Sequence, residues 1–167
     1  CKEPSAIGEP LYLDVVAALA GTPFAGAKVI GGRYGLGSKD TTPGGILSAF
    51  RNGQSDQPVR SFTININDDV THRSLPILEE PDVADADTIA CKFWGLGGDG
   101  TVGANKNSVK IIGDLTEKYA QAYFAYDAKK SGGVTQSHLR FSDQPIHATY
   151  LVQSADFVAV HNPAYLT

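Results

Sequence analysis

The feature that most constrains the fold is a strand followed by a glycine-rich turn and a helix, between residues 88 and 115. Residues 88–94 are rich in β-branched and aromatic side chains, which is typical of a buried strand. Glycines then stand at positions 95, 97, 98, 100 and 103, and apolar residues recur at helical spacing: Val102, Val109, Ile112 and Leu115. Such an arrangement presents backbone N–H groups and a helix N-terminus to an anion, most often a phosphate.

Composition limits the class of protein. With 167 residues, of which 42% are hydrophobic and 19% charged, the chain is predicted to be globular and to form about one domain, or a domain plus part of a neighbour. The formal net charge of −4 argues against a general nucleic-acid-binding surface. No apolar run approaches the roughly 20 residues of a membrane span. We therefore expect no nucleic acid as a partner, because of the charge, and no membrane, because the apolar runs are short.

The two cysteines, Cys1 and Cys91, have no metal-binding spacing and form no disulfide framework, which fits a cytoplasmic location. One alternative is a single disulfide between them. The other, which the position of Cys91 in a predicted strand favours, is a small buried apolar side chain. Because the sequence contains no methionine, we expect it to be a piece of a longer polypeptide.

Residues 1–69 are predicted to be the end of a preceding α/β domain. A helix is expected from Pro10, and strands are expected at 27–30 and at 61–67, where apolar and polar residues alternate. Residues 70–87 contain three Asp, two Glu and two Pro with little periodicity. This stretch is therefore predicted to be an acidic linker.

A second helix is expected in the first part of the chain, just after two threonines. Thr41 or Thr42 can cap this helix, and Pro43 suits its first turn. The helical spacing of the apolar residues then predicts its inward face, which would consist of Ile46, Leu47 and Phe50.

Residues 88–167 are predicted to form a second structural unit. After the central strand, turn and helix, further strands are expected at 119–126, 134–141 and 156–160. Within 134–141, Leu139 and Phe141 alternate with His138 and Arg140, which predicts a strand with one face toward water. The alternation of strands and helices predicts an α/β fold, with a mostly parallel sheet and flanking helices.

Three glycines of the central turn, Gly95, Gly97 and Gly100, match the G-x-G-x-x-G pattern of dinucleotide-binding folds in the expected strand-to-helix context. The Rossmann form of this site also uses an acidic residue about 20 residues further on. Asp127 follows the next predicted strand, but it lies 27 residues past Gly100, so the fit is loose. The alternative is a tight turn whose glycines only supply positive φ angles.

A second glycine loop, residues 127–133, follows the strand at 119–126 and contains paired lysines. In a parallel sheet this loop lies at the same carboxyl edge as the central turn, which is where ligands bind. A solvated loop is the alternative. The two loops together predict a phosphate site, whose candidate residues are Gly97, Gly98, Asp99, Gly100, Thr101, Lys129, Lys130 and Ser131. Asn105 and Asn107, at the start of the predicted helix, are weaker candidates, because capping is the commoner role of such residues.

No catalytic or metal-ligating group is predicted in this chain. The four histidines, at 72, 138, 147 and 161, lie in different elements without the spacing of a metal site. No Ser or Cys stands beside a His and an acid as in a hydrolase triad. Asp68 and Asp69 end a predicted strand, where a loop-capping role is more common than metal binding.

Several strings of this sequence resemble the pyruvate:ferredoxin (flavodoxin) oxidoreductases, in the middle region equivalent to the gamma subunit of the multi-subunit 2-oxoacid:ferredoxin oxidoreductases. The resemblance covers nearly the whole chain. It is carried by residues 93–107, 110–114, 119–124, 129–135 and 137–141, and upstream by residues 31–36, 38–39, 62–63 and 68–71.

The resemblance implies an enzyme that converts pyruvate and coenzyme A into acetyl-CoA and CO₂ and passes two electrons to ferredoxin or flavodoxin. In that family, thiamine diphosphate with magnesium and the 4Fe–4S clusters are held by other domains, and this sequence has motifs for neither. Residues 88–167 would then be a C-terminally truncated gamma-type domain that helps to bind coenzyme A and packs against other domains or subunits. By itself the chain would be inactive.

Two further hypotheses remain beside the resemblance. The first is a Rossmann-type nicotinamide-binding dehydrogenase domain that uses the turn from Gly95 to Gly100 together with Asp127. The second is a structural spacer whose loops only contact neighbouring domains.

Overall fold

The computed structural model describes residues 6–127 and 132–166. The chain divides into two units, Cys1–Pro81 and Asp82–Thr167. The division falls inside the stretch 70–87 that was predicted to be a linker. Among the described residues, no helix is both long enough and apolar enough to cross a membrane.

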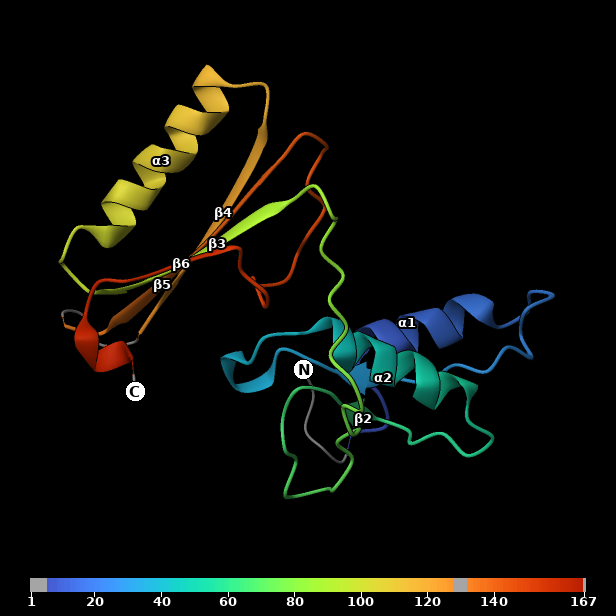
Figure 1. The fold of residues 1–167 in the computed structure, drawn as a ribbon. Coiled ribbons are helices and arrows are strands. Elements are labelled where there is room, and N and C mark those ends of the chain that lie inside the picture. The colour runs from blue at the N-terminus through green and yellow to red at the C-terminus, as the bar shows by residue number, and fades with distance from the viewer. Residues whose placement is uncertain (1–5, 128–131, 167) are drawn as a thin grey trace. The chain divides into compact units, whose positions relative to one another are not determined.

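Unit 1 contains two helices and a small parallel sheet (Figure 1). Its elements are helix α1 (Pro10–Leu19), strand β1 (Gly32–Arg33), the 3₁₀ helix η1 (Leu36–Ser38), helix α2 (Pro43–Gln54) and strand β2 (Phe62–Thr63). The helix expected from Pro10 is confirmed. The strand expected at 27–30 is displaced to Gly32–Arg33, because pairing begins only where Gly32 meets Phe62. A side chain on Gly32 would collide with the Phe62 ring, so the glycine permits this pairing.

The beginning of the expected linker packs against strand β2. The Thr63 N–H donates to the Arg73 carbonyl at 3.0 Å, and the Leu75 N–H donates to the Thr63 carbonyl at 2.9 Å. Leu75 and Ile64 are both buried. The chain therefore remains part of unit 1 for several residues after β2.

The buried face of helix α2 differs from the expected one. Thr42 caps the helix, since its hydroxyl accepts from the Gly45 N–H at 3.2 Å. Of the three expected inward residues, Leu47 is half-buried, but Ile46 and Phe50 are 45% and 68% exposed, so the prediction was wrong for these two. The buried residues are small or polar instead: Gly44, Gly45, Ser48 and Asn52. The spacing of apolar residues predicted the wrong face because the polar side chains of Asn65 and Glu80 pack against the glycine face of α2. They lie so close to Gly44 and Gly45 that a side chain at either position would collide with them.

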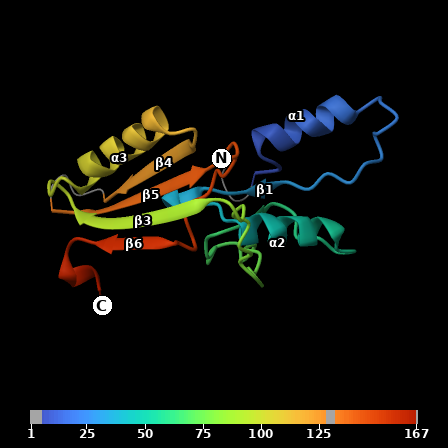
Figure 2. The same ribbon diagram turned by 45° about the horizontal axis from the view of Figure 1, so that its top comes forward.

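Unit 2 is a four-stranded sheet with one long helix (Figures 1 and 2). Its elements are β3 (Ile89–Leu96), α3 (Thr101–Leu115), β4 (Tyr119–Tyr126), β5 (Val134–Ser142), β6 (Phe157–Val160) and the 3₁₀ helix η2 (Pro163–Tyr165). The strand order is β4-β5-β3-β6. Strand β6 is parallel to β3, whereas β5 is antiparallel to both β3 and β4. The α/β class is confirmed, and the sheet is mixed.

The antiparallel strand β5 has a simple cause in chain length. Only residues 127–133 connect β4 to β5, and a parallel connection needs a crossover of a dozen residues or more. The chain therefore turns back as a hairpin. Because β3 and β4 both run opposite to β5, they point in the same direction, and their carboxyl ends lie at the same edge of the sheet.

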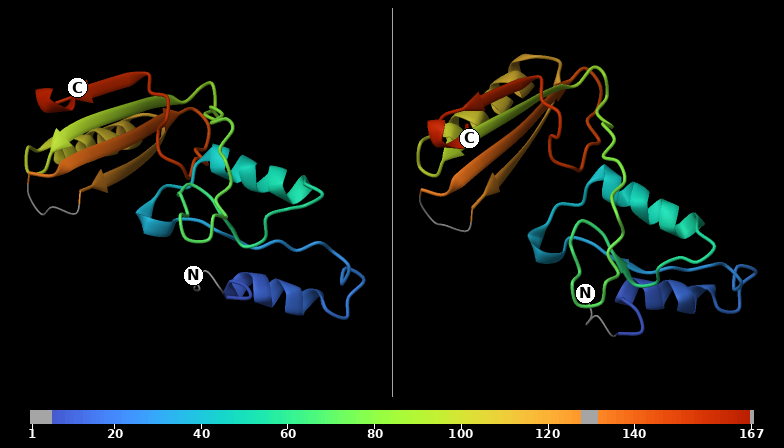
Figure 3. Two further views of the ribbon diagram at one scale, coloured as in Figure 1. Left: turned by 90° about the horizontal axis from the view of Figure 1, so that it is seen from below. Right: turned by 60° about the horizontal axis from the view of Figure 1, so that its bottom comes forward.

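Helix α3 covers one face of this sheet, as Figures 2 and 3 show. The core beneath it consists of Cys91, Leu139 and Phe141, and Val109 and Ile112 of the helix pack against these residues. The expected helical stripe is thus confirmed at its centre. At its end, however, Leu115 is 78% exposed.

The opposite face of β5 is buried too, so the expected water-facing side was wrong. His138 and Arg140 are only 1% and 4% exposed. Strand β5 is flanked on both sides, and the chain that follows it covers Arg140, whose Nη2 donates to the Tyr150 carbonyl at 2.8 Å. Arg140 Nη1 also donates to Gln121 Oε1 at 3.0 Å. Arg140 is thus held by buried hydrogen bonds, whereas both ring nitrogens of His138 are buried without a hydrogen-bond partner in the described part of the chain.

Candidate anion-binding site

The turn between β3 and α3 depends on glycine at two positions. Gly98 and Gly100 have φ angles of 95° and 89°, in the left-handed region that residues with side chains rarely adopt. Gly100 is also the N-cap of α3 and has no side chain to cap the helix, and the Asp99 carboxylate accepts from the Thr101 N–H instead. Neither Asn105 nor Asn107 therefore has the capping role that was the commoner expectation.

The structure brings the central turn and the second glycine loop together. The Gly97 N–H donates to the Gly133 carbonyl at 2.8 Å, and the Gly132 N–H donates to the Gly97 carbonyl at 3.4 Å. These bonds continue the antiparallel ladder in which Leu96 of β3 pairs with Val134 of β5, so this antiparallel pairing produces the contact, rather than the parallel pairing assumed from the sequence. Lys129, Lys130 and Ser131 lie outside the described residues, between Asp127 and Gly132.

A hollow of about 400 Å³ lies beside the turn. The turn and the first residues of α3 form one part of its wall, and two residues of the hairpin form the rest. The residues that line it are Leu96, Gly97, Gly98, Asp99, Gly100, Val102, Gly103, Tyr126 and Thr135. The start of α3 is therefore open to a ligand.

Asp99 occupies part of the anion-binding capacity of this turn. Its carboxylate accepts from the Leu96 N–H and from the Thr101 N–H, both at 2.8 Å. Burial by itself would raise the pKa of Asp99, but the hydrogen bonds from Thr101 and Leu96 outweigh it and lower the pKa below its ordinary value. The carboxylate is thus a charged group at the helix N-terminus.

The backbone amides of residues 97–101 fall into two groups. Three of them already donate within the protein: Gly97 to Gly133, Asp99 to the Leu96 carbonyl, and Thr101 to Asp99. The amides of Gly98 and Gly100 make no hydrogen bond to any residue that the structure describes. Within residues 97–101, these two amides are the ones without a described acceptor.

Thr101 packs against β3 and contacts a residue that the sequence did not suggest. A Cβ atom on Gly95 would lie 2.6 Å from Thr101 Oγ1, so the glycine allows helix and strand to approach closely. Thr101 Oγ1 lies 2.6 Å from His161 Nδ1, and the His161 N–H donates to the Trp94 carbonyl at 2.9 Å. Only the parallel pairing of β6 with β3 brings His161 here, and no local signal indicates that pairing.

The two asparagines of α3 point in different directions. Asn105 is 4% exposed and lies one turn after Thr101 on the buried side of the helix. Its Nδ2 group is buried and has no hydrogen-bond partner in the described part of the chain. Asn107 is exposed. The structure therefore groups Asn105, but not Asn107, with Thr101.

Asp68, the other polar candidate, closes a loop. Its Oδ1 accepts from the Thr71 N–H at 2.9 Å and from the Val70 N–H at 3.2 Å, as expected for a capping residue. Within residues 6–127 and 132–166, no group of three or more His, Cys, Asp or Glu residues is placed to hold a metal ion. Cys91 is a buried free thiol.

Comparison with known proteins identifies the class to which this fold and turn belong. Residues 90–167 match the family model described as pyruvate ferredoxin/flavodoxin oxidoreductase. The similarity to whole proteins extends over 99% of the chain, with more than half of the residues identical in several relatives. Residues 90–167 therefore belong to the pyruvate ferredoxin/flavodoxin oxidoreductase family.

Individual relatives show how small a part of such proteins this is. The chain is 56% identical over 165 residues to the pyruvate:ferredoxin oxidoreductase of Moorella thermoacetica and 54% identical over 166 residues to the pyruvate-flavodoxin oxidoreductase of Enterobacter agglomerans. It covers 14% of the length of each. It is also 50% identical to the pyruvate dehydrogenase [NADP(+)] of Cryptosporidium parvum, of which it covers 9%.

Proposed function

We propose that residues 88–167 help to bind coenzyme A in an enzyme that oxidises pyruvate to acetyl-CoA and CO₂ and passes electrons to ferredoxin or flavodoxin. In this proposal the chain supplies binding and domain packing, and the chemistry belongs to other domains. The observation that carries it is the hydrogen-bonded junction of the two glycine loops at Gly97 and Gly133, beside an open hollow. The names of the relatives support the reaction.

Coenzyme A carries three phosphates, so its site needs several donors and positive charge. The amides of Gly98 and Gly100 are two donors without a protein acceptor among the described residues. Because the Asp99 carboxylate would repel a phosphate, we expect positive charge to come from Lys129 and Lys130, with Ser131 as a further donor. Thr101 and Asn105 would then orient the start of α3.

Thiamine diphosphate, magnesium and the 4Fe–4S clusters are expected on other parts of the complete enzyme. This chain would contact those domains or subunits, and it would meet ferredoxin or flavodoxin only through them. The free thiol of Cys91 is consistent with the expected cytoplasmic location.

The strand order disfavours the Rossmann alternative. In that fold the strand after the crossover helix lies beside the first strand and is parallel to it. Here the antiparallel strand β5 separates β4 from β3, so Asp127 follows a strand that is not the neighbour of β3. A spacer function stays open as the second candidate, because the loops also contact each other without a ligand.

Steady-state kinetics of the full-length protein test the proposal. We expect Lys129→Ala combined with Lys130→Ala to raise the KM for coenzyme A about tenfold or more, through the loss of two charged hydrogen-bond donors, and to leave the KM for pyruvate unchanged. The matched control removes two other lysines of unit 2, Lys110→Ala with Lys118→Ala, and should change neither KM. An unchanged coenzyme A dependence in the first variant would contradict the assignment. Binding of NADPH but not of coenzyme A would favour the dehydrogenase domain.

A second variant tests the loop junction itself. A Cβ atom on Gly97 would lie 3.3 Å from the Gly133 carbonyl oxygen and 3.4 Å from the Gly132 nitrogen, which is tight against backbone. Gly97→Val should therefore separate the loops and weaken coenzyme A binding more than the lysine variant does. Gly53→Val is the control, because nothing lies within 4 Å of a Cβ atom at Gly53.

A further inference from the structure

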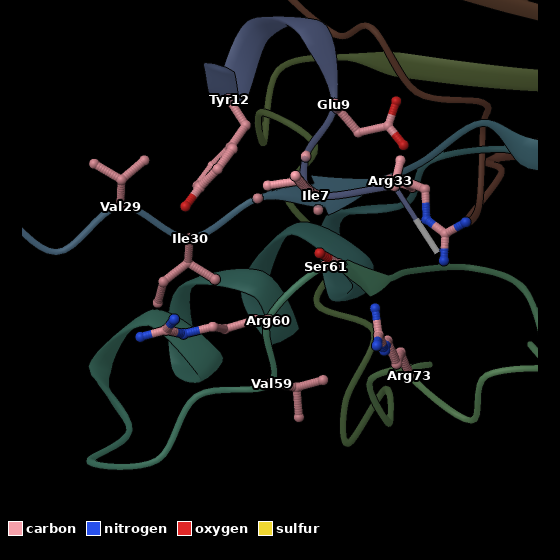
Figure 4. A pocket seen from close by; sticks show the side chains of 14 residues that line it. Ile7, Glu9, Tyr12, Val29, Ile30, Arg33, Val59, Arg60, Ser61 and Arg73 are labelled. Carbon is pink, nitrogen blue, oxygen red and sulfur yellow. The ribbon is translucent and has the colours of Figure 1, made fainter. Parts of the chain in front are cut away.

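Unit 1 contains a hollow that neither the sequence motifs nor the proposed coenzyme A site involves. It has a volume of about 560 Å³ and lies between the start of α1 and the β1–β2 pair (Figure 4). Three arginines are among the residues that line it: Arg33, Arg60 and Arg73. In Figure 4, Arg33 and Arg73 lie on one side of the hollow and Arg60 on the other, with Ser61 between them. We call this hollow the arginine pocket.

Arg33 is a buried charge whose hydrogen-bonding capacity is largely unused. The residue is 7% exposed, and its Nε and Nη2 atoms are buried without a hydrogen-bond partner in the described part of the chain. Asp68 Oδ2 is 3.8 Å from Nη2, which is an ion pair but too long for a hydrogen bond. The Asp68 carboxylate is instead bonded by the N–H groups of Val70 and Thr71. A guanidinium group buried in this way is costly unless an anion accepts its donors.

The remaining lining indicates what kind of ligand fits. Apolar side chains and an aromatic ring form much of the wall: Ile7, Tyr12, Val29, Ile30 and Val59. Glu9 is the one carboxylate among the described lining residues, and Asp68, which is not a lining residue, pairs with Arg33. The three guanidinium groups therefore leave an excess of one positive charge. A phosphate monoester carries a charge between about −1.5 and −2 at neutral pH, and arginine binds its oxygens in pairs. A volume of this size is typical of a small-molecule site.

We propose that the arginine pocket binds the phosphate group of a small phosphate monoester with an apolar or aromatic body. Arg33 is the central ligand-binding residue and donates from Nε and Nη2 to two phosphate oxygens. Arg60 and Arg73 add positive charge, and Tyr12 with its apolar neighbours contacts the body of the ligand. The site is separate from the coenzyme A site proposed for unit 2, since every lining residue belongs to unit 1.

Calorimetric titration of the full-length protein with four probes tests this proposal. Phenyl phosphate supplies the charge and the ring, benzoate replaces the phosphate by a carboxylate, inorganic phosphate lacks the ring, and phenol lacks the charge. We expect phenyl phosphate to bind most tightly and phenol not to bind. Benzoate binding as tightly as phenyl phosphate would overturn the assignment to phosphate monoesters. If phenyl phosphate does not bind, the proposed site is wrong. This is also the result expected if an acidic segment of the same polypeptide fills the pocket.

Variants assign the binding to the pocket. Arg33→Gln should weaken phenyl phosphate binding about tenfold or more, because two hydrogen bonds to a charged group are lost. Since Arg33 is buried and its replacement could disturb folding, Arg60→Gln at an exposed position is the second variant and should weaken binding several-fold, about the effect of one charge. The control is Arg51→Gln, which lies outside the pocket and pairs with Glu79. Binding that survives in both pocket variants would overturn the proposal, whereas Lys129→Ala with Lys130→Ala should leave phenyl phosphate binding unchanged.

Discussion

Helix α2 of unit 1 and helix α3 of unit 2 both have glycines at or beside their first turn, but the ends of the two helices differ. In α2, Glu80 closes the end: its Oε1 accepts from the Gly44 N–H at 2.9 Å, and its Oε2 accepts from the Thr42 hydroxyl at 2.8 Å. In α3, the local carboxylate of Asp99 accepts from Thr101, and an open hollow remains beside the helix. A helix N-terminus attracts an anion in both cases. The distant side chain of Glu80 closes the N-terminus of α2, whereas a hollow stays open beside the N-terminus of α3.

The units also differ in how their titratable groups are held. In unit 2, His138 is buried in the sheet, and in unit 1 the Asp68 carboxylate is hydrogen-bonded by its own loop. These environments shift the two pKa values in the same direction but through different pH ranges. Acid should therefore weaken the units at different stages.

The largest expected effect is the acid sensitivity of unit 2. Burial, and then the charges of Lys92 and Arg140, lower the pKa of His138 from 6.5 to about 4. Between these values the unfolded chain binds a proton that the folded chain does not, so stability falls as the pH drops from 6.5 to 4. The loss amounts to about 3 kcal/mol. Urea denaturation of the 167-residue chain at several pH values, followed by the fluorescence of Trp94, measures it.

The variant His138→Gln should flatten this pH dependence above pH 4. The control His147→Gln changes an exposed histidine of the same unit and should leave the pH dependence as it is. An equally steep loss of stability in both variants would show that another group is responsible.

The next largest effect concerns the close approach of β3 and α3. Gly95→Ala places a Cβ atom 2.6 Å from Thr101 Oγ1 and 2.7 Å from Thr101 Cβ, so the helix must shift. We expect a loss of about 2 kcal/mol in the free energy of unfolding, as is usual for overpacking. Gly103→Ala in helix α3 is the control, because nothing lies within 4 Å of a Cβ atom at this position. It should stabilise α3 by up to about 1 kcal/mol. A similar loss in both variants would contradict the packing argument.

A smaller effect is expected at the closed end of α2. Glu80→Ala leaves the Gly44 N–H and the Thr42 hydroxyl without their acceptor, which should cost about 1 kcal/mol. Hydrogen exchange of the Gly44 and Gly45 amides reports it directly. The neighbouring variant Glu79→Ala removes only an ion pair with Arg51. Because the side chains of Arg51 and Glu79 are 41% and 52% exposed, this loss should have little effect. If the two variants weaken α2 equally, Glu80 does not close the helix.

The smallest effect is expected for the acid sensitivity of unit 1. Hydrogen bonds from the Thr71 side chain and backbone lower the pKa of Asp68 from 3.8 to about 2. The stabilisation is present above pH 3.8 and is lost as the pH falls toward 2, below the range in which His138 acts. Because Val70 in this loop is 76% exposed, little packing depends on it. Hydrogen exchange of the loop amides between pH 4 and 2 should show protection that falls in the natural chain and changes less in Asp68→Asn.

Local sequence patterns predicted the elements whose signals lie within a few residues of one another. Strand β4 was predicted with the bounds that it has, and α3 follows the glycine turn as expected. Thr42 was one of two candidates for the cap of α2 and is the one that caps it. Backbone propensity, turn chemistry and helical spacing are properties of neighbouring residues, so the sequence by itself was sufficient for them.

Contacts between distant residues were decided only by the tertiary structure. The burial of His138 and Arg140, the glycine face of α2 and the meeting of Thr101 with His161 each join residues far apart in the chain. The junction of the two glycine loops was expected, yet it forms through the antiparallel pairing of β5 with β3 and not through parallel strands. The order and direction of the strands determine which distant side chains come into contact. Local sequence patterns do not give the order or the direction of strands.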